Sequence, residues 1–156
     1  HVLATIDIAP TSLGLLGIRV PKEWEGCDYS LLCHRKSNSF SYPTSAYIQS
    51  IIPEHHTHSV ELPWRGVVTV DGWKYVCLEG VPWMLFDLNK DPYELRNMAL
   101  CGVAREKRAE LHRQLEEWIE RTGDHFTLPK INFRNNLCEN TREIFGYPYY
   151  EPDIGD

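Results

Sequence analysis

Residues 66–78 read GVVTVDGWKYVCL. Two runs rich in β-branched and aromatic residues, 66–70 and 73–78, flank the dipeptide Asp71-Gly72. Asp-Gly is the dipeptide best suited to the two left-handed positions of a type I′ turn. The stretch therefore predicts a β-hairpin closed by a two-residue turn.

Neighbouring segments extend this hairpin into a small antiparallel sheet. Gly80 and Pro82 allow another reversal, into a third strand over Trp83–Phe86. Ala46–Ile52 is a candidate fourth strand that ends at Pro53. An isolated hairpin is only marginally stable in water, so we expect a further element to cover one face of the sheet.

An amphipathic helix predicted over residues 103–121 supplies that cover, and Thr122-Gly123 ends it. Its polar side chains point away from the apolar face. That face consists of Ala104, Leu111, Leu115, Trp118 and Ile119.

The first forty residues carry a second, shorter helical pattern. Ile8–Leu16 has apolar residues at helical spacing, with Asp7 as the expected N-cap and Gly17 as the terminator. The apolar stretch Val2–Ile8 is typical of an interior strand, and residues 19–43 are predicted to form a surface loop.

Composition excludes several function classes. The chain has 156 residues, 42% hydrophobic and 24% charged, as expected for one folded domain or a large piece of one. Its net charge of -6 disfavours binding to nucleic acid and to anionic membranes, so neither is expected as a partner. No stretch approaches the roughly 20 apolar residues of a membrane-spanning helix.

The five cysteines fit neither a structural zinc site nor a disulfide scaffold. Reduced, packed thiols favour a cytoplasmic location. Because the chain opens on His1 rather than Met, we expect polypeptide to precede it, which leaves secretion open.

His55, His56 and His58 fall within a short stretch and could in principle share a metal such as zinc. No cysteine or carboxylate follows at motif spacing. An exposed polar loop between Pro53 and Pro63 is the preferred interpretation.

Residues 87–91, DLNKD, reproduce the opening of a calcium-binding loop. The match then fails, because Pro92 occupies the position that requires glycine and Met98 the position that requires a bidentate glutamate. We expect a strand followed by an Asx-type turn instead.

Four ordered blocks of sequence together resemble the C-terminal part of a sulfatase of the alkaline phosphatase superfamily. None of the blocks is specific alone, but their order and spacing are. They are ATIDIAPT (4–11), EGCDYSLL (25–32), WRGV (64–67) with Asp71, Lys74 and Tyr75, and PWMLFDL (82–88) followed by DPYE (91–94) and Asn97.

The resemblance implies a fold class, an α+β piece of a larger α/β sulfatase fold. A small antiparallel sheet of about four strands would be covered by a C-terminal helix and preceded by the last strand and helix of the main domain. Residues 1–43 would end the main α/β catalytic domain, and 44–123 would form the C-terminal subdomain. Residues 124–156 would be an aromatic, acidic tail, through which a homo-oligomer is expected.

The resemblance also implies a function, metal-dependent hydrolysis of a small sulfate ester. The family uses a divalent cation, calcium or magnesium, and a formylglycine made from a Cys or Ser. No such residues match here; Asp7 is expected to be a helix cap rather than a ligand. The machinery would therefore lie upstream, and this chain alone is expected to be inactive.

Three residues, His56, Trp64 and Arg65, are candidates for lining the mouth of the substrate cleft, because loops beside a sheet carry specificity. Two alternatives stay open at this point. One is hydrolysis of a phosphodiester or phosphonate ester by an enzyme of the same superfamily. The other is a non-catalytic interaction module that docks through the aromatic residues Phe145–Tyr150.

Overall fold

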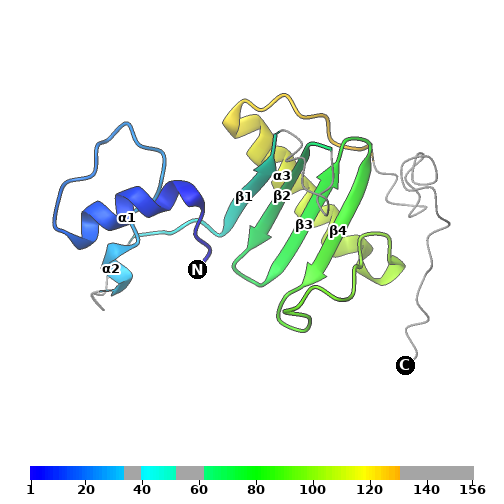
Figure 1. Cartoon of the computed structure of the whole chain (residues 1–156). Helices are drawn as coiled ribbons and strands as arrows, with labels where there is room; N and C mark the ends of the chain where they lie inside the picture. The colour runs from blue at the N-terminus through cyan, green and yellow to red at the C-terminus, as the bar shows by residue number, and fades with distance from the viewer. Residues whose placement is uncertain (34–39, 52–61, 131–156) are drawn as a thin grey trace. The chain divides into compact units, whose positions relative to one another are not determined.

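The structure is a computed structural model that describes residues 1–33, 40–51 and 62–130. The chain forms two compact units, His1–Ala46 and the residues from Tyr47 onward (Figure 1). The predicted histidine loop and the aromatic end of the tail lie outside the described residues. The domain boundaries proposed at residues 43 and 123 stay predictions.

The first unit contains a 3-10 helix η1 (Thr5–Asp7), a helix α1 (Ile8–Leu15) and a short helix α2 (Ser30–Cys33). The helix predicted near the N-terminus is therefore present. It ends as expected, because Gly17 adopts a left-handed conformation with φ of 70°.

Two predictions about this unit are wrong. The Asp7 carboxylate does not cap α1: the amides of Ala4 and Cys27 each donate to it over 2.7 Å. These two donors lie outside the helix and occupy both oxygens of the buried side chain. The strand expected over Val2–Ile8 is not formed, because residues 1–4 are irregular and the 3-10 turn follows at once.

The EGCDYSLL block has a structural explanation. A Cβ atom on Gly26 would collide with the carbonyl oxygen of Ile6, so only glycine fits there. One residue later the Cys27 amide donates to Asp7, and the Asp28 carboxylate accepts a 2.8 Å bond from the Ser30 amide at the start of α2. The motif therefore joins the segment after α1 to the 3-10 turn before it.

The second unit is built on a four-stranded antiparallel sheet in the order β1-β2-β3-β4 (Figure 1). Its strands are β1 (Ser45–Ser50), β2 (Trp64–Thr69), β3 (Trp73–Leu78) and β4 (Val81–Asp87). The predicted sheet is confirmed: the ends of β3 agree with the prediction, and those of the other strands are shifted by one or two residues.

The turn between β2 and β3 differs from the predicted type I′ turn. The connection has three residues, 70–72, and the Gly72 amide donates to the Thr69 carbonyl over 3.0 Å. Gly72 has a φ of 83°, whereas Asp71 has no positive φ, which a type I′ turn would require. The turn is fixed from outside: Asn89 Nδ2 donates to the Asp71 carbonyl, and the Leu88 amide to that of Gly72, both over 2.7 Å.

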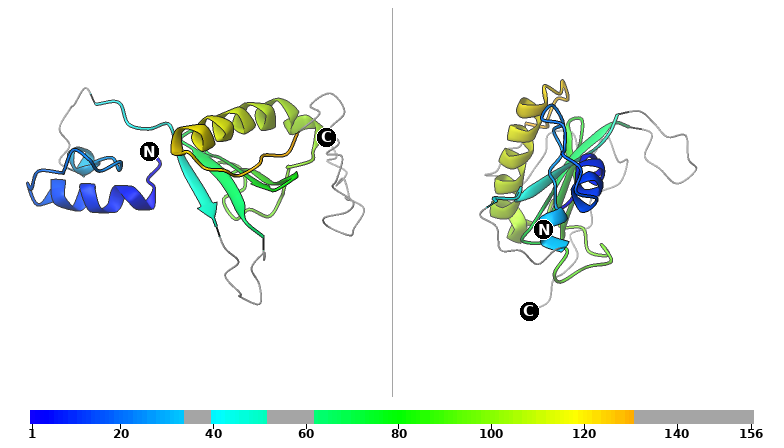
Figure 2. Two further views of the ribbon diagram at one scale, coloured as in Figure 1. Left: turned by 90° about the horizontal axis from the view of Figure 1, so that it is seen from above. Right: turned by 90° about the vertical axis from the view of Figure 1, so that its left-hand side faces the viewer.

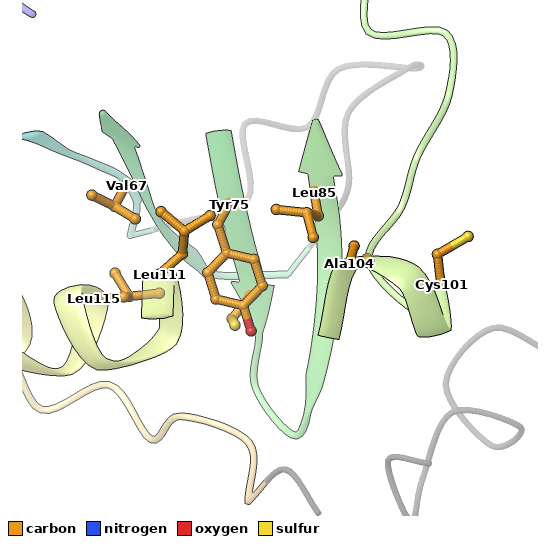
Figure 3. Close-up of a cluster of buried hydrophobic side chains, with 9 residues drawn as sticks. Val67, Tyr75, Leu85, Cys101, Ala104, Leu111 and Leu115 are labelled. Atoms are coloured by element: carbon orange, nitrogen blue, oxygen red, sulfur yellow. The ribbon is translucent and has the colours of Figure 1, made fainter. Parts of the chain in front are cut away.

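Helix α3 (Arg105–Thr122) lies along one face of the sheet, as the left view of Figure 2 shows. A 3-10 turn, η2 (Gly102–Ala104), leads into it, and Gly123 ends it in the left-handed conformation with φ of 63°. Figure 3 shows side chains of the sheet gathered with those of the helix. The buried cluster comprises Val67, Tyr75, Cys77, Leu85, Ala99, Cys101, Ala104, Leu111 and Leu115.

Two polar side chains of α3 are also buried, which the hydrophobic pattern did not predict. Arg108 is 1% exposed and donates from Nη1 to the Ala99 carbonyl over 2.5 Å. His112 lies 3.0 Å from the Tyr75 hydroxyl through Nδ1. Burial, with the neighbouring positive charge of Arg108, lowers the pKa of His112 to about 4.

Across the described part of the chain, none of the helices combines the length and the apolar character needed to cross a membrane.

The depressed pKa of His112 makes stability depend on pH. In the folded chain the imidazole stays neutral down to about pH 4, whereas in the unfolded chain it binds a proton near pH 6.5. Protonation therefore favours the unfolded chain below pH 6.5, and the free energy of unfolding falls as the pH is lowered toward 4. We expect urea unfolding to show a loss of roughly 2 to 3 kcal/mol from this group between pH 7.5 and pH 4.5. His112→Asn should remove that part of the slope.

The control is Tyr75→Phe, which removes the hydroxyl 3.0 Å from the His112 imidazole but keeps the buried ring and the titrating group, so the pH dependence of unfolding should persist. An unaltered slope in His112→Asn would show that the imidazole is not the group responsible.

Candidate functional site

Trp64 and Arg65 begin strand β2, and their side chains point to opposite faces of the sheet because side chains alternate along a strand. Trp64 packs against Leu78 and Val81. Arg65 pairs in register with Cys77 and lies on the face that α3 covers. The third candidate, His56, lies outside the described residues.

Arg65 forms a bidentate ion pair with Asp124, which follows the end of α3. Its Nε donates to Asp124 Oδ2 over 2.6 Å, and its Nη2 donates to Oδ1 over 3.2 Å. Nη1 donates to the carbonyls of Ser50 and Trp64 over 2.9 and 3.0 Å. The two charged side chains are 8% and 14% exposed, so this is a largely buried pair.

Two aromatic residues complete what we call the Arg65 cluster, made of Tyr47, Arg65, Asp124 and Phe126. The Tyr47 hydroxyl donates to Asp124 Oδ2 over 2.9 Å. The Phe126 amide donates to Asp124 Oδ1 over 2.9 Å, and the Phe126 ring lies 4.8 Å from the guanidinium carbon. The Tyr47 ring also stacks on Trp118 of α3, with centroids 5.9 Å apart.

The cluster shifts the acidity of its members in the directions that its charges predict. The hydrogen bond from Arg65 lowers the pKa of Asp124 to about 2, assisted by the bonds from Tyr47 and the Phe126 amide. Burial, together with the bond to Asp124, raises the pKa of Tyr47. At neutral pH the site therefore holds a carboxylate, a guanidinium and a neutral phenol.

This geometry suits a structural connection. These four hydrogen bonds use four of the five N–H donors of Arg65, and all their acceptors lie within the chain. They attach the segment after α3 to strands β1 and β2 at the edge of the sheet. The assignment of Arg65 and Trp64 to a substrate cleft stays a prediction.

Sequence reasoning missed Tyr47 and Asp124. The sequence pattern places Asp124 at the start of the tail, yet its carboxylate binds Arg65 of β2 directly after the end of α3. The sequence does contain an indication of such a partner. Arg65 lies two residues before the core residue Val67 on the same strand, so both side chains point to the same face of the sheet. An arginine at a core-facing strand position requires a buried acidic partner.

The described residues do not fit the divalent cation that the resemblance implies. In residues 1–33, 40–51 and 62–130, no three histidine, cysteine or acidic side chains converge on one point. The acidic side chains of the calcium-like segment bind their own backbone. Asp87 accepts from the Asn89 amide, as the predicted Asx turn requires, and Asp91 accepts from the amides of Leu95 and Arg96.

Comparison with known proteins gives one family. The profile described as N-sulphoglucosamine sulphohydrolase, C-terminal, matches residues 1–121, which include parts of both units.

Relatives of known function are similar over most of the chain. A Delta 4,5-hexuronate-2-O-sulfatase of Bacteroides thetaiotaomicron is 30% identical over 97% of this chain and 30% of its own length. Arylsulfatase K of Xenopus laevis is 29% identical over 76% of this chain and 22% of its own. An ulvan-active sulfatase of Formosa agariphila is 28% identical over 97% and 29%. The chain thus spans less than a third of these relatives.

Solved structures agree with the fold. A 2-O GAG sulfatase matches with a TM-score of 0.63 and 28% identity, over 76% of this chain and 25% of that one. A putative sulfatase from Bacteroides thetaiotaomicron matches with a TM-score of 0.62, also at 28% identity and over the same shares of the two chains.

Breaking the ion pair of the Arg65 cluster should cost stability. Arg65→Ala and Asp124→Asn each leave one charged or polar partner buried, so we expect each to lower the free energy of unfolding by about 3 kcal/mol. Arg65→Lys should not restore it, because an ammonium group cannot reproduce the bidentate geometry. Chemical denaturation measures both effects.

The control is Asp71→Asn, which removes a more exposed ion pair with Lys107 and should cost less than about 1 kcal/mol. An Arg65→Ala chain as stable as the unmodified one would contradict the structural role.

Proposed function

Because the chain belongs to the family of N-sulphoglucosamine sulphohydrolase C-terminal domains, we propose that it is the C-terminal part of a sulfatase that hydrolyses sulfate esters. The observation that carries this proposal is the family match over residues 1–121, in which four separate sequence blocks keep their order. The relatives reported above are all sulfatases. They give no support to the phosphodiester or phosphonate alternative.

The reacting groups belong, in this proposal, to polypeptide that precedes residue 1. Support comes from the share of the relatives that the chain spans, 30% or less. It also comes from the described carboxylates, since those of Asp7, Asp87 and Asp91 are engaged by the chain's own donors. The calcium or magnesium ion and the formylglycine would be held upstream. The described residues would pack beside the catalytic centre but would supply none of its metal ligands or reacting groups.

The surface of the first unit fits a contact with that preceding polypeptide. Helix α1 contains no charged residue, and most of its apolar side chains remain exposed. Ile8 is 62% exposed, and Leu16, which follows the helix, is 73% exposed. An apolar surface of this kind is characteristic of an interface with another part of the protein.

The substrate in this proposal is a sulfated carbohydrate. Two relatives are named for such substrates, a hexuronate 2-O-sulfate and ulvan, and the 2-O GAG sulfatase shares the fold at 28% identity. The chain would contribute side chains at the edge of the carbohydrate site, and the candidates for this role are His56, Trp64 and Arg65. A cytoplasmic location is retained as part of the proposal, on the free thiols of Cys27, Cys33 and Cys101.

Activity should depend on the preceding polypeptide. We expect the 156-residue chain alone to release no sulfate from aryl sulfates or sulfated disaccharides, whereas the full-length protein should do so and lose activity on chelation. Sulfate release is measured by ion chromatography.

The control is full-length protein in which the upstream formylglycine precursor is replaced by alanine, which should be inactive but folded. Metal-dependent hydrolysis by the chain alone, in preparations free of contaminating sulfatase, would contradict the proposed division of labour. A full-length protein without sulfatase activity would contradict the function itself.

A further inference from the structure

Two tryptophans lie on the face of the sheet that α3 does not cover. Trp64 of β2 is in register with Leu78 of β3, which is in register with Val81 of β4. Trp64 and Trp83 both pack on Leu78 and Val81, which are 1% and 0% exposed, while each indole remains partly exposed. We call these two residues the Trp pair.

The position of Trp83 depends on a β-bulge. Val76 pairs with Met84 and Cys77 with Pro82, so Trp83 has no partner on β3. Pro82 is tolerated because β4 is an edge strand. Bulges re-aim a side chain and are common beside functional sites.

The side chain of Asn97 fixes this bulge from the other side. Its Nδ2 donates to the Trp83 carbonyl over 2.8 Å, and its Oδ1 accepts from the Leu85 amide over 3.0 Å. Asn97 therefore binds two backbone groups of β4 that lie at the bulged residue and two residues after it. Asn97 also belongs to the fourth sequence block, so one role of that block is to stabilise the bulge in β4.

The Trp pair has the chemistry of a surface that contacts carbohydrate. Indole rings offer a large, rigid apolar area with little conformational entropy to lose on binding. The apolar C–H face of a pyranose ring is complementary to such a surface, whereas the sulfate group needs cationic partners elsewhere. Because fully buried Leu78 and Val81 lie beneath the indoles, the rings cannot move into the core.

We propose that Trp64 and Trp83 contact a pyranose ring of the saccharide substrate, with Asn97 as the positioning residue for Trp83. This inference rests on the proposed function for its substrate class. It goes further by assigning saccharide recognition to two residues of this chain, one of which the sequence patterns did not single out. The occupant is a sugar ring rather than the sulfate ester itself.

The test measures saccharide binding separately from turnover. Desulfated glycosaminoglycan and ulvan disaccharides are titrated into the full-length protein and followed by saturation-transfer NMR. Trp64→Leu and Trp83→Leu keep apolar bulk for packing but remove the indole, so each should weaken binding about tenfold. Trp83→Phe keeps an aromatic face and should retain most of the affinity.

The matched control is Trp73→Leu, on the face that α3 covers, where Lys107 Nζ lies 5.6 Å from the ring. It should bind the disaccharides as the unmodified protein does. Its kcat/KM with a small aryl sulfate should also change by less than about twofold.

Asn97→Asp tests the positioning role. It keeps the acceptor for the Leu85 amide and removes the donor to the Trp83 carbonyl. We expect weaker disaccharide binding with unchanged kcat for the aryl sulfate, a pattern that a general loss of folding would not produce.

Unchanged disaccharide affinity in Trp64→Leu and Trp83→Leu would overturn the inference, and so would a full-length protein that binds none of the disaccharides. Loss of affinity together with an equal loss of aryl sulfate turnover would indicate a packing role and would also overturn it. A protein that binds the disaccharides through the pair but hydrolyses no sulfate ester would contradict only the proposed function.

Discussion

Burial of one face of the sheet by α3 is the constraint on which the second unit depends. Four short strands cannot hold a stable sheet in water unless one face loses its contact with solvent. Tyr75, Leu85, Leu111 and Leu115 provide the apolar area, and the Arg65 cluster attaches the far end of the helix. The opposite face is then left to carry the Trp pair on strands that this packing makes rigid.

Polar side chains fix the places where the backbone departs from regular geometry. Asp7 binds amides on either side of the first helices, Asn89 holds the β2–β3 turn, and Asn97 holds the bulge in β4. Each bond satisfies backbone groups that no ladder or helix could satisfy. Residues of the sequence blocks that resemble sulfatases, such as Asp7 and Asn97, thus stabilise the local backbone and do not need a reacting group for that role.

Local patterns predicted the elements whose causes are local. The β-rich runs around Asp71-Gly72 gave the hairpin, and Gly123 gave the end of α3. What could not be predicted depends on partners distant in sequence. Asn89 determines the turn type from 18 residues away, and Asp124 lies 59 residues from Arg65. At the candidate site, the place of Arg65 in the substrate cleft stays a prediction, and its ion-pair partner Asp124 was not predicted.

The central claim is that these residues support a sulfatase centre that other polypeptide supplies. The most direct test is the coding sequence upstream of residue 1. The account predicts an open frame that continues upstream and contains a C/S-x-P-x-R segment together with acidic residues suited to a divalent cation. An upstream sequence unrelated to sulfatases, or a start codon immediately before the codon of His1, would contradict it.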